Sequence, residues 1–319
     1  MGEFDVIARY FRRAQDQGGV VSLAGGDDCA VLQPTPGQQW LVSTDMLVEG
    51  RHFLTTVPPE ALGHKALAVN LSDLAACGAT PRAFFLSLAL PRVEESWLAG
   101  FARGLFALAD AHGIRLAGGD TTAGPLNICI TVMGEAPAGQ ALLRSGARVG
   151  DDVWVSGVLG DARLALELWR GRVQLSGEDF EHVRRAMEWP QPRVALGQAL
   201  RGVATAALDV SDGLAGDLGH LLARSGVGAC LEWAALPRSE ILARQAQDLQ
   251  HECLLAGGDD YELVFTAAPQ ARSSVEAIAR ALGLPVHRIG RIEAQPGLRL
   301  VDAQGQTQAV RVQSFDHFA

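Results

Sequence analysis

The sequence lacks the residues on which the common nucleotide-binding loops depend. Of its 27 basic residues all but one are arginine, and the single lysine, Lys65, lies in GHKAL. A P-loop requires Gly-Lys-Ser/Thr at its end, and no G-x-G-x-x-G fingerprint occurs either, so both loops are excluded. The net charge of −9 disfavours nucleic acid as a partner, because basic patches bind phosphate backbones.

Other absences concern membranes and thiol chemistry. No apolar run approaches the roughly 18–20 residues that a membrane helix needs, so we expect no membrane association. The opening sequence MGEFDVIARYF has neither the basic start nor the apolar stretch of a signal peptide, which predicts a cytoplasmic protein. The five cysteines form no Cys-x-x-Cys pair, which excludes the usual zinc and redox motifs.

What is present indicates a two-domain α+β protein. Hydrophobic residues make up 48% of 319 residues, enough for roughly two domain cores. A Pro/Gly-rich connector over 136–151 predicts a boundary, with an N-terminal domain of 1–137 and a C-terminal domain of 138–319. Periodicity predicts strands at 40–43, 83–91, 114–117, 126–135, 152–157, 205–211, 229–233, 263–267 and 286–292, and helices at 60–77, 94–113, 161–170, 178–188, 192–201, 212–225, 240–248 and 271–283. Helices layered on a sheet are the expected arrangement.

Aspartates recur in one short pattern. The sequence LAGGD occurs from Leu23, Leu116 and Leu255. Glycine is common in turns, but adjacent carboxylates repel each other unless a cation lies between them. Further aspartates are expected at strand ends and strand-to-helix turns, and Asp73 inside a helix. The full set is Asp27, Asp28, Asp45, Asp73, Asp120, Asp209, Asp212, Asp259 and Asp260.

Asp73 points most directly to a metal ion. It lies in a largely apolar helix, with Asn70 one turn earlier on the same face. A carboxylate there is costly unless it is paired or metal-bound. We therefore hypothesise several Mg²⁺ ions, which are held by one or two carboxylates plus substrate phosphates, although calcium and manganese share these ligand types. The paired glycines would let backbone N–H groups approach the phosphates.

Each of these residues also has a structural explanation. A single Gly-Gly-Asp is more often a turn than a ligand. Asp212 could cap the following helix, and Asp73 could be a satisfied polar residue at a helix or subunit contact. His52 could be an ordinary, partly exposed histidine, and Arg144 a plain surface arginine. Taken together, so many acids at similar positions favour a site for metal and phosphate.

Longer segments resemble a known enzyme family. GDDCAVL, STDMLVEGRHF, KALAVNLSDLAACGATPRAFFLSLALP, GGDTTAGP, RSGARVGD, ALDVSDGLAGDLGHL, GGDDYELVFT and the terminal FDHFA follow one another along nearly the whole chain. Together they resemble the thiamine-monophosphate kinase family of the aminoimidazole ribonucleotide synthetase superfamily. The resemblance implies an N-terminal mixed sheet that pairs across a homodimer, a C-terminal α/β domain, and a kinase that uses ATP and Mg²⁺ to convert thiamine monophosphate into thiamine diphosphate.

The resemblance also implies roles for individual residues. Metal ligands would be Asp28, Ser43, Thr44, Asp45, Asp73, Asp120, Asp209 and Asp212. ATP would be contacted by Gly119, Asp120, Arg144 and Ser211, and thiamine monophosphate by His52, Asp259, Asp260 and Phe315. Asp45, Asp73, Asp120 and Asp212 are expected to be the catalytic carboxylates.

Two positions depart from the family pattern, and two other functions stay open. Asp259 stands where the family usually has Glu. Phe315 stands where Tyr or Trp is frequent, so its ring can stack on the substrate but offers no hydroxyl contact. One alternative is a sibling ATP-using enzyme such as aminoimidazole ribonucleotide synthetase, and another is a non-catalytic MgATP-binding module. Selenophosphate synthetase is disfavoured because the first cysteine, Cys29, lies inside the acidic motif, and the hydrogenase-maturation relative because the chain does not end in cysteine.

Overall fold

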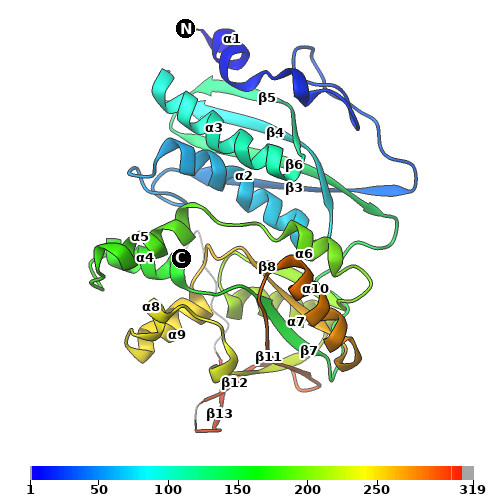
Figure 1. The fold of residues 1–319 in the computed structure, drawn as a ribbon, viewed down its shortest axis with the longest axis vertical. Coiled ribbons are helices and arrows are strands. Elements are labelled where there is room, and N and C mark those ends of the chain that lie inside the picture. Colours follow the sequence, from blue (N-terminus) through cyan, green and yellow to red (C-terminus); the bar gives the residue numbers. More distant parts are fainter. Residues whose placement is uncertain (1, 303, 311–319) are drawn as a thin grey trace. The chain divides into compact units, whose positions relative to one another are not determined.

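A computed structural model describes residues 2–302 and 304–310. Figure 1 shows the fold as a ribbon whose colours follow the sequence from the N-terminus to the C-terminus. The backbone forms two compact units, one of Met1–Leu74 and Ala79–Gly139, the other of Ala75–Gly78 and Gln140–Ala319. Both units combine helices with a sheet, so the expected mixed α/β composition is confirmed. Within the described residues, no helix combines the length and apolar character that crossing a bilayer requires.

The first unit is built on a four-stranded sheet. Its elements are α1 (Glu3–Val6), a π-helical turn (Ile7–Phe11), a 3₁₀ turn (Ala14–Asp16), β1 (Val21–Leu23), β2 (Val31–Leu32), β3 (Gln38–Val48), α2 (Pro59–Ala76), β4 (Thr80–Leu90), α3 (Glu95–His112), β5 (Arg115–Ala123) and β6 (Asn127–Pro137). The sheet order is β3-β6-β4-β5, with β4 and β5 parallel and the other pairs antiparallel. The ribbon shows α2 and α3 together over one face of this sheet (Figure 1).

The distribution of apolar residues accounts for the helices and the inner strands of this unit. Alternate residues of β4 and β6, such as Phe84 and Ile130, are buried. Helix α2 is buried almost all round from Ala61 to Ser72, as expected for a helix without a solvent face. Helix α3 ends at Gly113, whose left-handed φ of 63° confirms the predicted C-cap.

Two strands are longer than predicted, and this moves two aspartates into strand interiors. Asp45 was expected at the end of a strand, but β3 continues to Val48 and pairs with β6 along its whole length. Asp120 was expected in a turn, but β5 continues to Ala123 beside β4. The prediction failed because polar residues on the open face of a sheet resemble a turn in sequence, whereas backbone pairing fixes the strand.

The two helices of the first unit contact each other through glycine. A Cβ atom on Gly104 would lie 1.8 Å from the carbonyl oxygen of Glu60, and one on Gly63 would lie 2.0 Å from that of Phe101. Both neighbours are backbone atoms, so no rotamer change could relieve the overlap. Close approach of α2 and α3 therefore requires glycine at both positions.

We expect Gly104→Ala to lower the free energy of unfolding by about 2–3 kcal/mol, because the helices must separate to admit the methyl group. Alanine's better helix propensity offsets only about 1 kcal/mol of this. Urea unfolding measures the difference. Gly177→Ala is the matched control, since a Cβ on this first residue of α5 (Gly177–Glu188) meets nothing within 4 Å. Equal destabilisation by both variants would contradict the close-approach explanation.

A buried carboxylate holds the loop before β3. Glu135 is 1% exposed and accepts hydrogen bonds from the Thr35 N–H (2.8 Å), the Thr35 hydroxyl (2.8 Å) and Arg82 Nε (2.9 Å). Burial alone would raise the pKa of Glu135, but the bonds from Thr35 and the Arg82 charge outweigh it and lower the pKa below its usual 4.5. The ionised form of Glu135 therefore stabilises the folded unit.

The stabilisation by Glu135 should depend on pH with a fixed sign. Because its folded pKa is depressed, the contribution is complete above pH 4.5 and is lost as pH falls through the folded pKa. We expect Glu135→Gln to cost about 1–2 kcal/mol at pH 7. Urea unfolding of both proteins at pH 7 and at stepwise lower pH should show this gap shrinking below pH 4.5. A gap independent of pH would show that the Glu135 charge contributes nothing.

The second unit contains a seven-stranded, mostly antiparallel sheet. Its elements are β7 (Asp152–Ser156), α4 (Asp161–Trp169), α5 (Gly177–Glu188), α6 (Val194–Ala199), β8 (Ala206–Val210), α7 (Leu214–Ser225), β9 (Gly228–Glu232), a 3₁₀ turn (Trp233–Ala235), α8 (Glu240–Ala243), α9 (Gln247–Ala256), β10 (Glu262–Ala267), a 3₁₀ turn (Pro269–Ala271), α10 (Arg272–Leu282), β11 (Val286–Glu293), β12 (Gly297–Val301) and β13 (Thr307–Ala309). The sheet order is β13-β12-β9-β11-β7-β10-β8. The single helix predicted over 240–248 is wrong, because α8 and α9 are separate helices there.

The register of this sheet brings three loops to one end. Strand β10 runs antiparallel to β8 and β7, with Glu262 opposite Val210 and Val264 opposite Val155. The same end of the sheet therefore carries the turn after β8, the loop before β10 and the loop after β7. Candidate residues from distant parts of the sequence meet there.

Candidate functional site

In the first unit, β3 and α2 bring together three predicted metal ligands. Ser43 and Asp45 lie two residues apart and so on one face of the strand. The Ser43 hydroxyl donates a hydrogen bond to Asp73 Oδ2 (2.5 Å), and the Asp45 N–H donates to Asn70 Oδ1 (3.1 Å). Because β3 is the edge strand, its outward N–H is available to the helix. Asn70 thus fixes the strand against α2 beside the carboxylates.

The first two Gly-Gly-Asp copies lie against each other. A Cβ on Gly25 would come 3.7 Å from the Gly118 Cα, so the bend that carries Asp28 lies next to β5, which carries Asp120. Gly119 has φ of 150°, and a Cβ there would lie 1.8 Å from the Leu86 carbonyl oxygen, so only glycine fits. Asp28 and Asp120 are both exposed.

Thr44 lies on the opposite face of β3 from Ser43 and Asp45. Its hydroxyl is 2.7 Å from that of Thr131 on β6, and Val42 and Met46 flank it at 58% and 53% exposure. The structure therefore places the predicted ligands of the first unit on both faces of the sheet. Ser43 contacts Asp73, whereas Thr44 contacts Thr131.

His52 follows β3 in a turn that its own side chain holds. The Val48 N–H donates to His52 Nδ1 (2.9 Å), so this nitrogen is an acceptor and neutral imidazole carries its proton on Nε2. The ring is half-buried. The contact with Val48 therefore fixes the orientation of the ring within the turn.

In the second unit, the turn after β8 carries Asp209, Ser211 and Asp212. Asp209 is 4% exposed, at the end of the strand. Gly213 is the N-cap residue of α7, and no side chain forms a capping hydrogen bond there. Asp212 precedes the cap, so the alternative interpretation of Asp212 as the helix cap is wrong. Instead, Asp217 in the first turn accepts the Ser211 and Asp212 N–H groups on one oxygen, each at 3.0 Å.

The third Gly-Gly-Asp copy packs on this turn. The Asp259 N–H donates to the Ser211 carbonyl (2.9 Å), and a Cβ on Gly258 would come 2.7 Å from the same oxygen. Asp259 and Tyr261 have φ of 66° and 51°, values that non-glycine residues rarely adopt. The Tyr261 hydroxyl donates to Asp259 Oδ1 (3.1 Å). Such local strain is typical of ligand-binding loops.

Asp260 is held inside the loop. The Gly160 N–H, at the start of α4, donates to Asp260 Oδ1 (2.8 Å), while Oδ2 is buried without a hydrogen-bond partner among the described residues. Burial raises the pKa of Asp260 well above its usual value, and the acids Glu262, Asp161 and Asp259 raise it further against the Gly160 bond. A neutral carboxyl group fits this position better than a charged one.

Burial also raises the pKa of Asp217, to about 7. The two backbone hydrogen bonds and the charge of Arg144 oppose the shift, and the charge of Asp212 adds to it. Arg144 itself is exposed, and the Ser225 hydroxyl donates to its carbonyl (3.3 Å). The turn of the second unit therefore combines acids with a nearby exposed arginine.

These donor sets fit Mg²⁺ only in company with a ligand. Within 2–302 and 304–310, no three His, Cys, Asp or Glu side chains stand close enough to hold a metal ion by themselves. Carboxylate and hydroxyl oxygens around Ser43 and Asp73 are nevertheless the hard donors that Mg²⁺ takes, one or two at a time, with substrate phosphates as further ligands.

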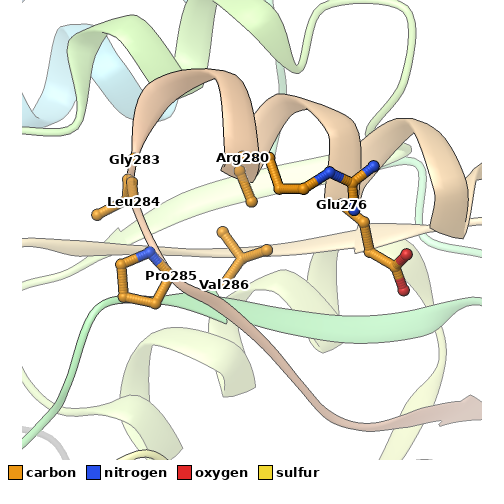
Figure 2. A pocket seen from close by; sticks show the side chains of 7 residues that line it. Glu276, Arg280, Gly283, Leu284, Pro285 and Val286 are labelled. Atoms are coloured by element: carbon orange, nitrogen blue, oxygen red, sulfur yellow. The ribbon is translucent and has the colours of Figure 1, made fainter.

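The surface hollow in Figure 2 is separate from these residues. It measures about 370 Å³ and lies between the end of α10 and the start of β11, lined by Glu276, Arg280, Pro285 and Val286 among others. None of the predicted site residues in the described part of the chain lines it. Phe315, predicted to stack on the substrate, lies outside the described residues.

The sequence interpretation missed Asp217 and Tyr261. An acid in the first turn of a helix is a known signal for binding backbone N–H groups, so Asp217 could have been found beside Asp212. Tyr261 had no such signal, because its contact with Asp259 depends on the unusual backbone of the loop.

Two family models match the chain. AIR synthase related protein, N-terminal domain, matches residues 26–136, and AIR synthase related protein, C-terminal domain, matches residues 148–303. Thiamine-monophosphate kinase from Salmonella typhimurium is 44% identical over 100% of this chain and 98% of its own length. The one from Bacillus subtilis is 35% identical over the full length of both.

Solved structures agree with these matches. Thiamine-monophosphate kinase from Stenotrophomonas maltophilia has a TM-score of 0.84 and 46% identity, over 93% of this chain and 94% of that one. AaThiL complexed with AMPPCP and TMP has a TM-score of 0.78 and 31% identity, over 92% and 91%. The chain therefore belongs to the AIR synthase related proteins and, within them, to the thiamine-monophosphate kinase family.

Proposed function

We propose that this protein transfers the γ-phosphoryl group of ATP to thiamine monophosphate, giving ADP and thiamine diphosphate. The observation that carries the proposal is full-length identity of 42–44% to thiamine-monophosphate kinases from Escherichia coli and Salmonella typhimurium. The 31% identical structure with AMPPCP and TMP supports both substrates, since AMPPCP is an analogue of ATP. Domains of 1–137 and 138–319 and a cytoplasmic location belong to the same proposal.

Several Mg²⁺ ions would accompany ATP in this reaction. Their ligands would be Asp28, Ser43, Thr44, Asp45, Asp73, Asp120, Asp209 and Asp212. Bound there, the ions would neutralise the charge of the phosphates, which the carboxylates alone would repel. Ser43 supports the site by holding Asp73, and Asn70 by holding the backbone of Asp45. Gly119, Asp120, Arg144 and Ser211 would contact ATP.

The attacking group would be the phosphate of thiamine monophosphate. A phosphomonoester has its second pKa near roughly 6, so at pH 7 it is already mostly dianionic and needs no general base. The protein's task is to hold two anions in line and to balance their charge. Arg144 would contribute positive charge, and His52, Asp259, Asp260 and Phe315 would contact thiamine monophosphate. Transfer would be direct, without a phosphorylated protein.

We also propose a homodimer formed through the first unit. The face of β3 opposite Ser43 and Asp45 exposes two large apolar side chains, Val42 and Met46. An exposed apolar sheet face is typical of an interface. Light scattering should give twice the 33.8 kDa chain mass, and Val42→Asp should halve it.

The test of the reaction is ADP release with MgATP, with and without thiamine monophosphate, followed by identification of the product. ADP that depends on the acceptor, together with thiamine diphosphate, is expected. MgATP binding without acceptor-dependent ADP would contradict the proposed acceptor.

A further inference from the structure

Asp217 is a buried acid that none of the proposed ligand contacts uses. It is 5% exposed and is the fourth residue of α7. One oxygen, Oδ2, accepts both the Ser211 and the Asp212 N–H at 3.0 Å. These two residues precede the N-cap Gly213, so their N–H groups lie outside both β8 and the helix.

A shared carboxylate acceptor restricts the turn strongly. Backbone N–H groups between a strand and a helix need an acceptor when water is excluded, and here one oxygen of Asp217 accepts two of them. Two consecutive N–H groups that converge on one atom also restrict the rotation of the peptide between them. The arrangement resembles a capping box that reaches beyond the cap, to the second and first residues before it.

The other side of the turn is held by the third Gly-Gly-Asp. The Ser211 carbonyl accepts the Asp259 N–H (2.9 Å), and the Val210 carbonyl accepts the Tyr261 N–H (2.8 Å). The N–H groups of the turn are thus bound by Asp217 and its carbonyl groups by the 257–261 loop. Without Asp217, half of these restraints would be lost.

We propose that Asp217 is a positioning residue for the nucleotide half of the site. It holds Ser211 and Asp212 through their backbone and does not itself touch the nucleotide. The inference rests on the proposed function, which assigns Ser211 to ATP and Asp212 to a metal ion. What matters is an oxygen acceptor at the position of Oδ2, and a negative charge there is not required.

Three substitutions separate these features. Asp217→Asn keeps an oxygen acceptor at the same distance and removes the charge. Asp217→Glu keeps the charge and moves the acceptor by one methylene, and it stays informative if Asp217→Ala, which removes both, does not fold. Asp152→Asn is the matched control, because Asp152 is 1% exposed and lies at the opposite end of the same strands, opposite Ala267.

Three measurements apply to each variant: hydrogen exchange of the peptide spanning 208–214, the Kd for MgATP, and the KM values for ATP and thiamine monophosphate. For Asp217→Ala and Asp217→Glu we expect faster exchange of the Ser211 and Asp212 amides. MgATP should bind about tenfold more weakly, and KM should rise more for ATP than for the acceptor. Asp217→Asn should stay within about threefold of the natural protein, and Asp152→Asn should change none of these values.

Other outcomes would overturn the inference. Faster amide exchange with unchanged MgATP binding would reduce Asp217 to a structural role. Normal behaviour of Asp217→Glu with loss in Asp217→Asn would show that the charge, and not the acceptor, is required. Equal loss in Asp152→Asn would indicate general destabilisation. Failure of the natural protein to make thiamine diphosphate would reject the proposed acceptor only, because MgATP binding would still decide the role of Asp217.

Discussion

Asp73→Asn should lower kcat by about 100- to 1,000-fold while leaving the fold intact. The asparagine oxygen can still accept the Ser43 hydroxyl, so the contact between α2 and β3 survives. Only the negative charge is lost, and with it the affinity for the metal ion that we propose there. The measurements are acceptor-dependent ADP release at saturating substrates and thermal unfolding.

The control for Asp73 is Asp110→Asn. Asp110 is on α3 in the same unit, where it forms an exposed ion pair with Arg13 (3.0 Å). Exposed pairs contribute little, so this variant should keep its turnover and its stability. If Asp73→Asn were as active as Asp110→Asn, Asp73 would be a satisfied polar residue of the helix, which is the structural alternative.

Asp212→Asn should separate activity from stability. Its charge lies near the buried Asp217 and raises the pKa of that group, so the repulsion between these two carboxylates opposes folding. Removing the charge should leave the melting temperature unchanged or raise it slightly, while kcat falls by about 100-fold or more through loss of a metal ligand. Asp212 is not the N-cap of α7, so the substitution leaves the helix cap unchanged.

Asp152→Asn should have the opposite effect, lowering stability without lowering kcat. Asp152 is buried and pairs with Arg272 at 2.6 Å and Arg288 at 3.5 Å. Its loss should lower the free energy of unfolding by about 1–3 kcal/mol without changing kcat. If Asp212→Asn destabilised the protein as Asp152→Asn does, and lost activity only in proportion, Asp212 would be a structural acid.

Local rules explain what the sequence predicted correctly. The apolar stripe of α3 and the glycine at its end are visible in the sequence, and the structure has both, with Gly113 in the left-handed conformation. The strands of the second unit, such as β8 and β10, are short apolar runs buried on both faces. Periodicity and capping act within a few residues, so they can be read without knowing the fold.

Long-range pairing explains what was missed. The hydrogen bond between Ser43 and Asp73 depends on how α2 packs beside β3. The contact of Gly25 with Gly118 depends on the path that the chain takes between these two residues. Neither follows from local sequence. The three identical Gly-Gly-Asp copies also have different backbones, a bend, a strand and a strained loop, because their surroundings differ. Identical short motifs therefore do not predict identical backbone conformations.

The measurement that tests the central claim most directly is a single turnover with γ-labelled ATP. The protein, Mg²⁺ and thiamine monophosphate would be mixed and quenched at intervals, and the label followed in protein, inorganic phosphate and thiamine diphosphate. Direct transfer predicts label in thiamine diphosphate at the rate of ADP release, with none bound to protein. Label that appears first on the protein, or only in inorganic phosphate, would contradict the account.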